Sequence, residues 1–128
     1  MKRVWLGVRD VIAFHAELLA QYGGRPGMRD PGLLVSALAR PRNRAAYGKA
    51  TVFELAAACA HGIARNHPFI DGNKRTALVC CFTFLELNGW EVDAPEADTV
   101  VTFLAVAEGK LSEGELADWL MHHSAKTR

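Results

Sequence analysis

The stretch FELAAACAHGIARNHPFIDGNKRTALVCCFTFLELN, residues 53–88, decides the fold. Its first part, from Phe53 to about Arg65, is rich in alanine and almost wholly apolar, which predicts a buried helix. The segment HPFIDG cannot continue that helix, because Pro68 disfavours helical geometry at the residue before it and Gly72 marks a turn. A second apolar helix is predicted from about Asn73 to Asn88. Two apolar helices joined by a polar loop therefore form the predicted centre of the molecule.

Two further helices are predicted before this pair. Apolar residues at helical spacing indicate one from about Val8 to Tyr22, which the following glycines end. Asp30 and Pro31 are a typical helix start, an N-cap followed by proline at the first helical position. We expect this helix to be short and to end at Pro41, and we expect residues 42–52 to be irregular.

The chain after residue 88 predicts an extended piece and two more helices. The extended piece is expected at Trp90–Val92, and Pro95 opens a helix that runs to about Ala107. Ser112 and Glu115 form the capping-box pattern of the last helix. No pair of alternating runs indicates a sheet core, so the fold class is all-α, a compact bundle of about six helices. A length of 128 residues fits one domain, 1–128.

Composition and charge give no support to several classes of function. Lys and Arg number 15 against 14 for Asp and Glu, and the net charge of +1 gives no global reason to bind nucleic acid or a membrane surface. No apolar run approaches the roughly 20 residues of a membrane span. Arg9 and Asp10 interrupt the N-terminal segment before a signal-peptide core could form. The cysteines are odd in number, and Cys80 and Cys81 are adjacent in an apolar run, as in proteins with reduced thiols, so we expect a cytoplasmic location.

Reactive residue types concentrate in the loop between the two central helices. A connector of this kind needs only a few polar turn residues, yet this one holds a histidine, a carboxylate, an amide and two cations. Lys74 and Arg75 stand at the positive end of the helix dipole, where acidic residues are usual. A phosphate bound at the helix N-terminus would relieve this mismatch, and the Asp71–Gly72 turn could aim N–H groups at it. The alternative is that both cations extend into solvent or pair with Asp71.

The other polar residues of the loop each have two interpretations. His67 could take a proton from a hydroxyl as a general base, or its ring could be satisfied by a backbone carbonyl. Asp71 and Asn73 could hold Mg²⁺ or could cap the following helix. Arg65 lies in the last turn of a helix, where a cation is stabilising in any case. The structural interpretation is preferred for the remaining histidines, which are His15, His61, His122 and His123.

Other constellations are weaker. The glycine-rich segment 23–27 lacks the spacing and the Lys-Ser/Thr ending of a phosphate-binding P-loop. Cys59 and His61 supply too few ligands for a metal site. A basic stretch is either a solvated loop or a docking surface for an acidic partner; it comprises Arg40, Arg42, Arg44 and Lys49.

The run HPFIDGNKR, residues 67–75, resembles the signature of the Fic/Doc family and specifically its Doc (death-on-curing) branch. The segments GMRDPGLLVSALARP, FLELNGW and AEGKLSEGELADWL also resemble Doc proteins, so the resemblance covers essentially the whole chain. It implies a Fic-type helical fold and an ATP-using transferase that acts on a protein hydroxyl. By position, His67 would be the base, Asp71 would hold Mg²⁺ on the nucleotide phosphates, and Phe69 would anchor the loop. The residues expected to bind the phosphates are Arg65, Gly72, Asn73, Lys74 and Arg75.

The resemblance also indicates which group is transferred. Fic adenylyltransferases carry glycine at the position of Lys74 and a further arginine at the position of Leu78. In Doc proteins the lysine form goes with kinase chemistry, and the target is a threonine of translation elongation factor Tu. The resemblance therefore implies a serine/threonine kinase that blocks translation, more than an adenylyltransferase. A catalytically idle, partner-binding helical module remains a third alternative, although it gives no reason to keep the reactive loop together.

Doc proteins are toxins of type II toxin–antitoxin modules. Self-inhibited Fic proteins carry a Ser/Thr-x-x-x-Glu-Gly/Asn segment, whereas here Ser112 is followed four positions later by Leu116. The resemblance therefore implies inhibition in trans, by an antitoxin whose disordered C-terminal tail folds into a helix in a groove of the toxin.

Overall fold

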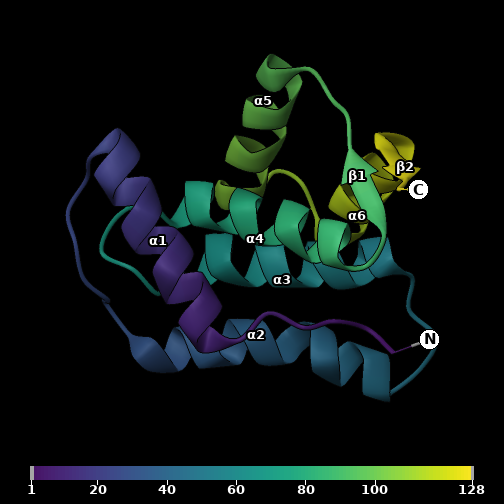
Figure 1. Cartoon of the computed structure of the whole chain (residues 1–128), viewed down its shortest axis with the longest axis horizontal. Helices are drawn as coiled ribbons and strands as arrows, with labels where there is room; N and C mark the ends of the chain where they lie inside the picture. Colours follow the sequence, from purple (N-terminus) through teal and green to yellow (C-terminus); the bar gives the residue numbers. More distant parts are fainter. Residues whose placement is uncertain (1, 128) are drawn as a thin grey trace.

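Six helices and one short two-stranded ribbon form the computed structural model, which describes residues 2–127 (Figure 1). The helices are α1 (Val8–Tyr22), α2 (Pro31–Ala46), α3 (Val52–Asn66), α4 (Asn73–Leu87), α5 (Glu96–Ala107) and α6 (Glu113–His122). Strands β1 (Trp90–Val92) and β2 (Ser124–Lys126) pair antiparallel. The predicted all-α class is confirmed, and the ribbon is the one sheet in the described residues.

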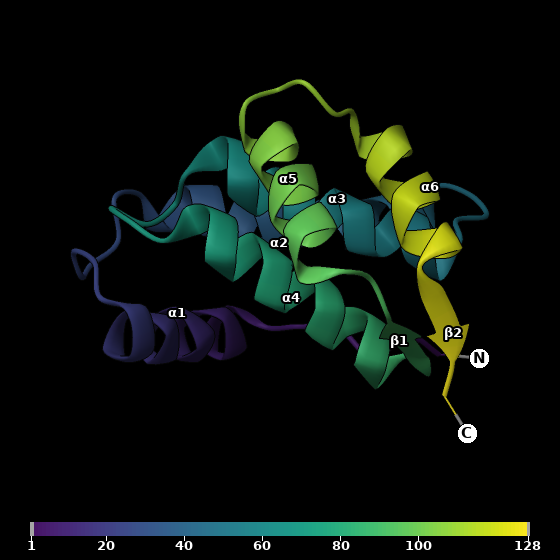
Figure 2. The ribbon, with the colours of Figure 1, turned by 90° about the horizontal axis from the view of Figure 1, so that it is seen from above.

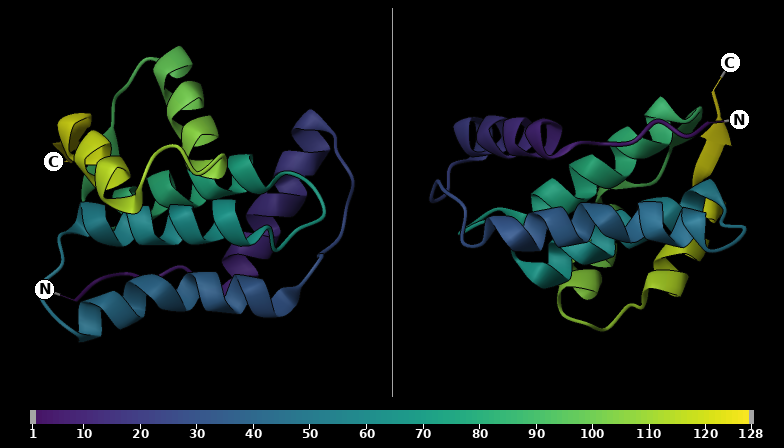
Figure 3. Two further views of the ribbon diagram at one scale, coloured as in Figure 1. Left: turned by 180° about the vertical axis from the view of Figure 1, so that it is seen from behind. Right: turned by 90° about the horizontal axis from the view of Figure 1, so that it is seen from below.

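Helix α3 lies at the centre and packs against α2, α4 and α6 (Figures 1 and 3). Its alanines are almost completely buried, and small side chains let neighbouring helices approach closely. Gly62 shows how close α2 comes: a Cβ atom at this position would lie 3.1 Å from the Cα of Ala37. At its start, Thr51 caps the N–H of Glu54, and the Glu54 carboxylate accepts from the N–H of Thr51. The alanine-rich pattern therefore produces the buried central helix that the sequence predicts.

Helix α4 runs beside α3 and is covered by α1 on one side and α5 on the other (Figure 2). Its buried face includes Cys80 and Cys81, and both thiols are unbonded. Burial raises the pKa of both thiols far above the ordinary cysteine value, so they remain protonated packing groups. The connections α1–α2 and α3–α4 meet at one end of the molecule, and this end holds the reactive loop (Figures 1 and 2).

Helix α2 does not end at Pro41, and this prediction was wrong. The helix continues to Ala46 with Pro41 in its interior, so residues 42–46 are helical rather than irregular. Pro41 is buried against the core, and the last turns are held by ion pairs of Arg40 and Arg44 with Glu113. Tertiary packing therefore outweighs the hydrogen bond that proline removes.

Two of the four cations of the basic stretch, Arg40 and Arg44, form ion pairs within the fold. Arg44 also pairs with Glu54 at 2.6 Å, and the Arg42 guanidinium lies 5.4 Å from the centre of the Trp5 ring. These contacts join α2 to α3, to α6 and to the N-terminal segment. The side chains of Arg42 and Arg44 thus have partners within the protein.

Strand β2 was not predicted. It is three residues long, without an alternating pattern, and it forms only because Trp90–Val92 offers an edge to pair with. The extended piece at Trp90–Val92 was predicted correctly and is β1. The capping box of Ser112 and Glu115 at the start of α6 is also confirmed.

Candidate functional site

The loop between α3 and α4 begins at His67, which ends α3 in the left-handed conformation with φ 52° and ψ 58°. It is the one non-glycine residue with positive φ in residues 2–127. Its backbone N–H donates to the carbonyl of Ile63 at 3.3 Å, and its side chain is exposed at the surface of the groove described below. A residue with a Cβ atom pays for this conformation with roughly 1 kcal/mol or more, so the surrounding contacts must hold it in place.

Phe69 and Asn73 fix the loop from the inside. Phe69 is 1% exposed, which confirms its predicted role as the anchor of the loop. The buried side chain of Asn73 accepts from the N–H of Phe69 at 3.0 Å and donates to the carbonyl of Phe69 at 2.9 Å. The Asn73 amide is therefore used within the protein, and the contribution that Asn73 can offer a phosphate comes from its backbone N–H in the first turn of α4.

His15 supports the same loop from helix α1. Its ring stacks on Phe69 with 3.8 Å between the ring centres, and its Nε2 lies 2.8 Å from the backbone oxygen of Asp71. The expectation of a backbone partner is confirmed for His15, and likewise for His122 and His123, which bond carbonyls one turn earlier.

The segment 24–30, here called the strap, lies alongside the loop. The N–H groups of Arg29 and Asp30 both donate to the carbonyl of Pro68, at 2.8 and 3.0 Å. The N–H of Ile70 donates to the carbonyl of Gly27 at 3.1 Å, and Met28 forms an antiparallel bridge with Phe69. The loop is thus held between the core on one side and the strap on the other.

Asp71 carries an ionised carboxylate at the tip of the loop. Its two oxygens accept from the backbone N–H of Arg25 at 3.1 Å and of Gly72 at 2.9 Å. These two hydrogen bonds lower the pKa of Asp71 below the ordinary aspartate value, with smaller contributions from the charges of Arg25 and Arg75. The N-cap of α4 is Gly72 with φ 80°, so the capping interpretation of Asp71 was wrong.

A carboxylate with this environment fits Mg²⁺ bound together with a nucleotide. Each oxygen keeps a lone pair beyond the hydrogen bond it already accepts. Mg²⁺ commonly uses one or two carboxylates and completes its shell with phosphate oxygens and water. In residues 2–127 no group of three or more His, Cys, Asp or Glu side chains could hold a metal by itself. A metal held by Asp71 would therefore depend on the phosphates for its other ligands.

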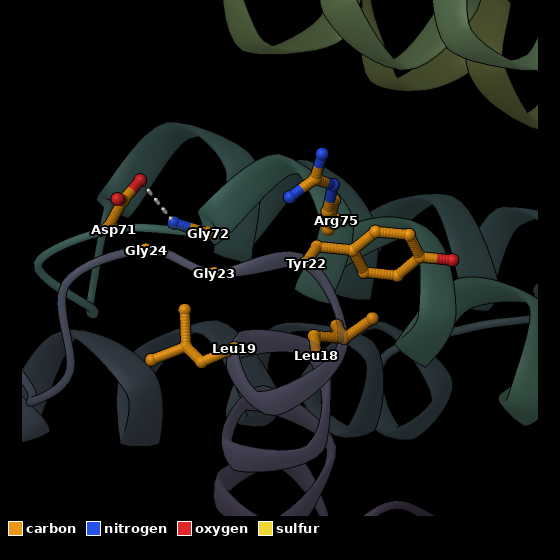
Figure 4. Close-up of a pocket in the computed structure, with 8 residues that line it drawn as sticks. All are labelled: Leu18, Leu19, Tyr22, Gly23, Gly24, Asp71, Gly72 and Arg75. Atoms are coloured by element: carbon orange, nitrogen blue, oxygen red, sulfur yellow. Dashed lines mark hydrogen bonds between the residues drawn. The ribbon is translucent and has the colours of Figure 1, made fainter.

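The two cations at the start of α4 remain available to an anion. Both residues are exposed, as the solvent alternative expects, but neither forms an ion pair with Asp71 among the described residues. The Arg75 guanidinium instead lies over the ring of Tyr22, 4.6 Å from its centre (Figure 4). A cation held by an aromatic face keeps its N–H donors free at its edges.

A groove of about 650 Å³ brings most of these residues together. It lies between the loop, the first turns of α4, and α5, with polar groups toward the loop and apolar side chains along α4 and α5. It is lined by His67, Ile70, Asp71, Gly72, Asn73, Lys74, Arg75, Leu78, Val100, Phe103, Leu104, Ala107 and Glu108. Of the residues predicted to form the site, all but Arg65 line this groove.

Arg65 has a different place. Its Nη1 donates to the carbonyl of Ala107 at 2.9 Å, at the end of α5. This hydrogen bond satisfies a terminal helix carbonyl and ties α5 to α3 beside the groove. Arg65 thus supports the α5 wall of the groove through Ala107 without lining the groove itself.

A smaller cavity of about 240 Å³ opens on the other side of the loop, at the end of α1 (Figure 4). It shares the lining residues Asp71, Gly72 and Arg75 with the groove. Its other lining residues are Leu18, Leu19, Tyr22, Gly23 and Gly24. Its lining includes no histidine, and its one carboxylate, Asp71, is shared with the groove. We therefore place the candidate site in the larger groove, where His67 and Lys74 lie.

Comparisons with known proteins point to one family. A family model described as the Fic/DOC family matches residues 5–85. The chain is 42% identical over 114 residues to "Protein kinase doc" of Escherichia phage P1, and the match covers 87% of this chain and 88% of the phage protein. It is 43% identical over 76 residues to "Toxin Doc" of Mycolicibacterium smegmatis, covering 57% of this chain and 58% of that protein. No helix among residues 2–127 has the length and apolar character needed to cross a membrane.

Proposed function

The chain belongs to the Fic/Doc family, and from this we propose that it is the toxin of a toxin–antitoxin module and acts as an ATP- and Mg²⁺-dependent protein kinase. The observation that carries the proposal is the groove in which His67, Asp71 and the cationic start of α4 meet. The names of the two relatives support a toxin and a kinase for this family branch.

His67 is the proposed general base. Its imidazole takes the proton of a serine or threonine hydroxyl on the target protein, and the hydroxyl oxygen forms a bond to the γ-phosphorus of ATP. The bond from the γ-phosphorus to the bridging oxygen breaks, and ADP leaves with the electron pair. His67 lies at the polar end of the groove, so a hydroxyl and a phosphate bound there would both be within its reach.

The start of α4 is the proposed phosphate site. The backbone N–H groups of its first turn belong to Asn73, Lys74 and Arg75, and Lys74 and Arg75 also add two positive charges. Gly72, the N-cap, already donates its N–H to Asp71 and brings the backbone close to the phosphate position. Asp71 would hold Mg²⁺ against the phosphates, where the metal neutralises charge that develops during transfer. The loop is fixed by Phe69 and by the strap, so these groups are arranged before the nucleotide arrives.

Two residues favour transfer of the γ-phosphoryl over transfer of AMP. Lys74 stands where Fic adenylyltransferases have glycine, and Leu78 stands where they have a further arginine. Both line the groove, and Leu78 gives it an apolar wall where an arginine would clamp a phosphate through two hydrogen bonds. The groove therefore lacks one phosphate clamp and gains a point charge beside the helix start.

The proposed target is translation elongation factor Tu, and the proposed consequence is a block of translation. The proposed inhibitor is an antitoxin whose C-terminal tail folds into a helix in a groove of this protein. We place the protein in the bacterial cytoplasm, where both partners are made, and its three buried unbonded thiols fit a reducing compartment.

The proposal is tested by incubating the protein with elongation factor Tu, ATP and Mg²⁺ and measuring the intact mass of the factor. We expect the mass of one phosphoryl group to be added, and a peptide map to place it on a serine or threonine. The His67→Ala variant is the control and should add nothing. An elongation factor of unchanged mass beside a wild-type protein that stops growth would show that the target is another protein.

A further inference from the structure

We propose that Arg29 is a positioning residue for this reaction: its side chain holds the backbone of His67 in the conformation that presents the imidazole to the groove. The proposal rests on the proposed function of His67 as the base. It adds a residue from the strap, 38 positions away in the sequence, to the machinery of the loop.

The Arg29 guanidinium grips the end of α3 at two consecutive carbonyls. Its Nε donates to the carbonyl of His67 at 2.8 Å, and its Nη2 donates to the carbonyl of Asn66 at 2.6 Å. The planar fork of arginine suits such a pair of oxygens because its donors have a fixed spacing. The carbonyl of His67 forms the peptide bond to Pro68, so its direction is set by the backbone angle ψ of His67.

His67 needs such support because its conformation is unfavourable for a residue with a side chain. Helices often end with one residue in the left-handed region, but that residue is usually glycine. Here a histidine with φ 52° takes the place. Holding its carbonyl and the preceding one removes the alternatives in which the peptide plane turns and carries the imidazole away from the groove.

The other contacts of the strap do not replace this one. Arg29 and Asp30 bind Pro68 through their backbone N–H groups, and Gly27 receives the N–H of Ile70 through its carbonyl. These bonds persist when the Arg29 side chain is changed. The Asn66 side chain donates to the carbonyl of Leu33, and among the side chains of residues 2–127 only that of Arg29 donates to the carbonyl of Asn66. A substitution at Arg29 therefore loosens His67 while the strap stays in place.

Charge alone does not account for the contact. A cation near the C-terminus of α3 is favourable whether it is arginine or lysine. Lysine, however, has one ammonium group on a flexible chain and cannot bond both carbonyls with fixed geometry. Arg29→Lys therefore keeps the charge and loses the fork, and Arg29→Met loses both.

The test measures phosphoryl transfer by these two variants, with Arg9→Met as a control for loss of an exposed arginine that forms no ion pair in residues 2–127. A misplacement of a reacting group by about 1 Å can lower a rate by about 100-fold. We expect Arg29→Met to lower kcat by about 10- to 100-fold with KM for ATP close to the wild-type value, and Arg29→Lys to recover only part. Arg9→Met should match wild type.

The decisive comparison adds His67→Ala. If Arg29 acts through the imidazole, Arg29→Met should have no further effect on the residual rate of His67→Ala. An equal loss in both backgrounds would overturn the proposal, as would a loss confined to KM or full activity of Arg29→Met.

A second readout separates this proposal from the proposed function. The backbone NMR signals of His67 should shift in Arg29→Met and much less in Arg9→Met, with or without substrate. If the wild-type protein transfers nothing from ATP, the proposed function fails, and unchanged His67 signals in Arg29→Met would overturn the positioning role as well.

Discussion

At the scale of the residue, the proposed reaction depends first on His67. Loss of a positioned base costs about 10²- to 10⁴-fold in rate, and its side chain is exposed, so His67→Ala should fold normally. We expect this variant to transfer phosphate at a rate lower by that factor and to lose growth inhibition when expressed without an antitoxin. Circular dichroism checks the fold, and a growth curve at matched expression checks toxicity. Full toxicity of His67→Ala would remove His67 from the mechanism.

Lys74 and Asp71 should be visible in nucleotide binding. A ligand at about 100 times its Kd stabilises the native state by about 2.7 kcal/mol, so ATP with Mg²⁺ should raise the Tm of the wild-type protein. Lys74→Ala and Asp71→Ala should reduce that rise. Lys49→Ala, an exposed change outside the groove, should leave it intact.

The same Lys74→Ala variant makes a second prediction in the absence of nucleotide. Removing a cation from the positive end of α4 should leave the Tm unchanged or slightly higher. A clear loss of stability without ligand would show that Lys74 has a structural role instead.

The sequence predicted the residues of the loop because they are contiguous and chemically unusual. It could not predict the contacts that reach the loop from elsewhere. His15 and Arg29 bond residues 56 and 38 positions away, and no local pattern marks either one. Arg65 shows the reverse: it lies next to the loop in sequence, but its side chain bonds the end of α5.

At the scale of the element, α2 and α3 pack closely at Gly62. A Cβ atom there would lie 3.0 Å from Cδ of Arg40 and 3.1 Å from both Cα and Cβ of Ala37. Alanine gains about 1 kcal/mol of helix propensity over glycine, but overpacking of a core costs about 1–3 kcal/mol. Since the Ala37 backbone cannot move aside easily, we expect Gly62→Ala to lower the free energy of unfolding.

Gly114 in α6 is the matched control, because nothing lies within 4 Å of its Cβ position. Gly114→Ala should raise the free energy of unfolding by up to about 1 kcal/mol. Urea denaturation of the two variants measures both values. A stabilised Gly62→Ala protein would mean that the α2–α3 contact is looser than described.

The start of α3 should respond to pH through Glu54. The N–H of Thr51 lowers the pKa of Glu54, burial opposes this shift, and Arg44 adds to it. A carboxyl group whose pKa is lowered in the folded state stabilises the fold at pH values above its ordinary pKa of 4.5. The stabilisation is lost as the pH falls through the lowered pKa. Wild type should thus be more stable than Glu54→Gln at pH 7, and the difference should shrink in acid. A difference that is the same at both pH values would contradict this assignment.

Local signals predicted most elements well because caps and periodicity act within a few residues. The bounds Val8–Tyr22 of α1 and the capping box of α6 agree with the prediction. The predicted end of α2 at Pro41 was wrong because the burial of Pro41 and the ion pair from α2 to α6 keep the following residues helical. Strand β2 has no signal of its own and exists through pairing with β1.

At the scale of the whole molecule, the fold places the α1–α2 and α3–α4 connections at one end. Helix α5 forms one wall of the groove beside the α3–α4 loop. The strap and the α3–α4 loop come from different parts of the chain, yet they share backbone hydrogen bonds and so form one support for the site. The groove continues from the charged loop along the apolar faces of α4 and α5, where Val100 and Leu104 are partly exposed. The polar end of the groove holds the proposed base and phosphate site, and the apolar walls along α4 and α5 are accessible to a bound substrate.

The central claim is that this groove transfers the γ-phosphoryl group of ATP, and one measurement tests it most directly. Elongation factor Tu is incubated with the protein and Mg²⁺ in parallel reactions with ATP labelled on the α- or the γ-phosphate, and the label on the factor is counted. Lys74 and Leu78 should disfavour the pose that presents the α-phosphate to His67, so label from the γ position and none from the α position is the predicted result. Label from the α position alone, with the mass of an AMP adduct, would contradict the account and show that this protein is an adenylyltransferase.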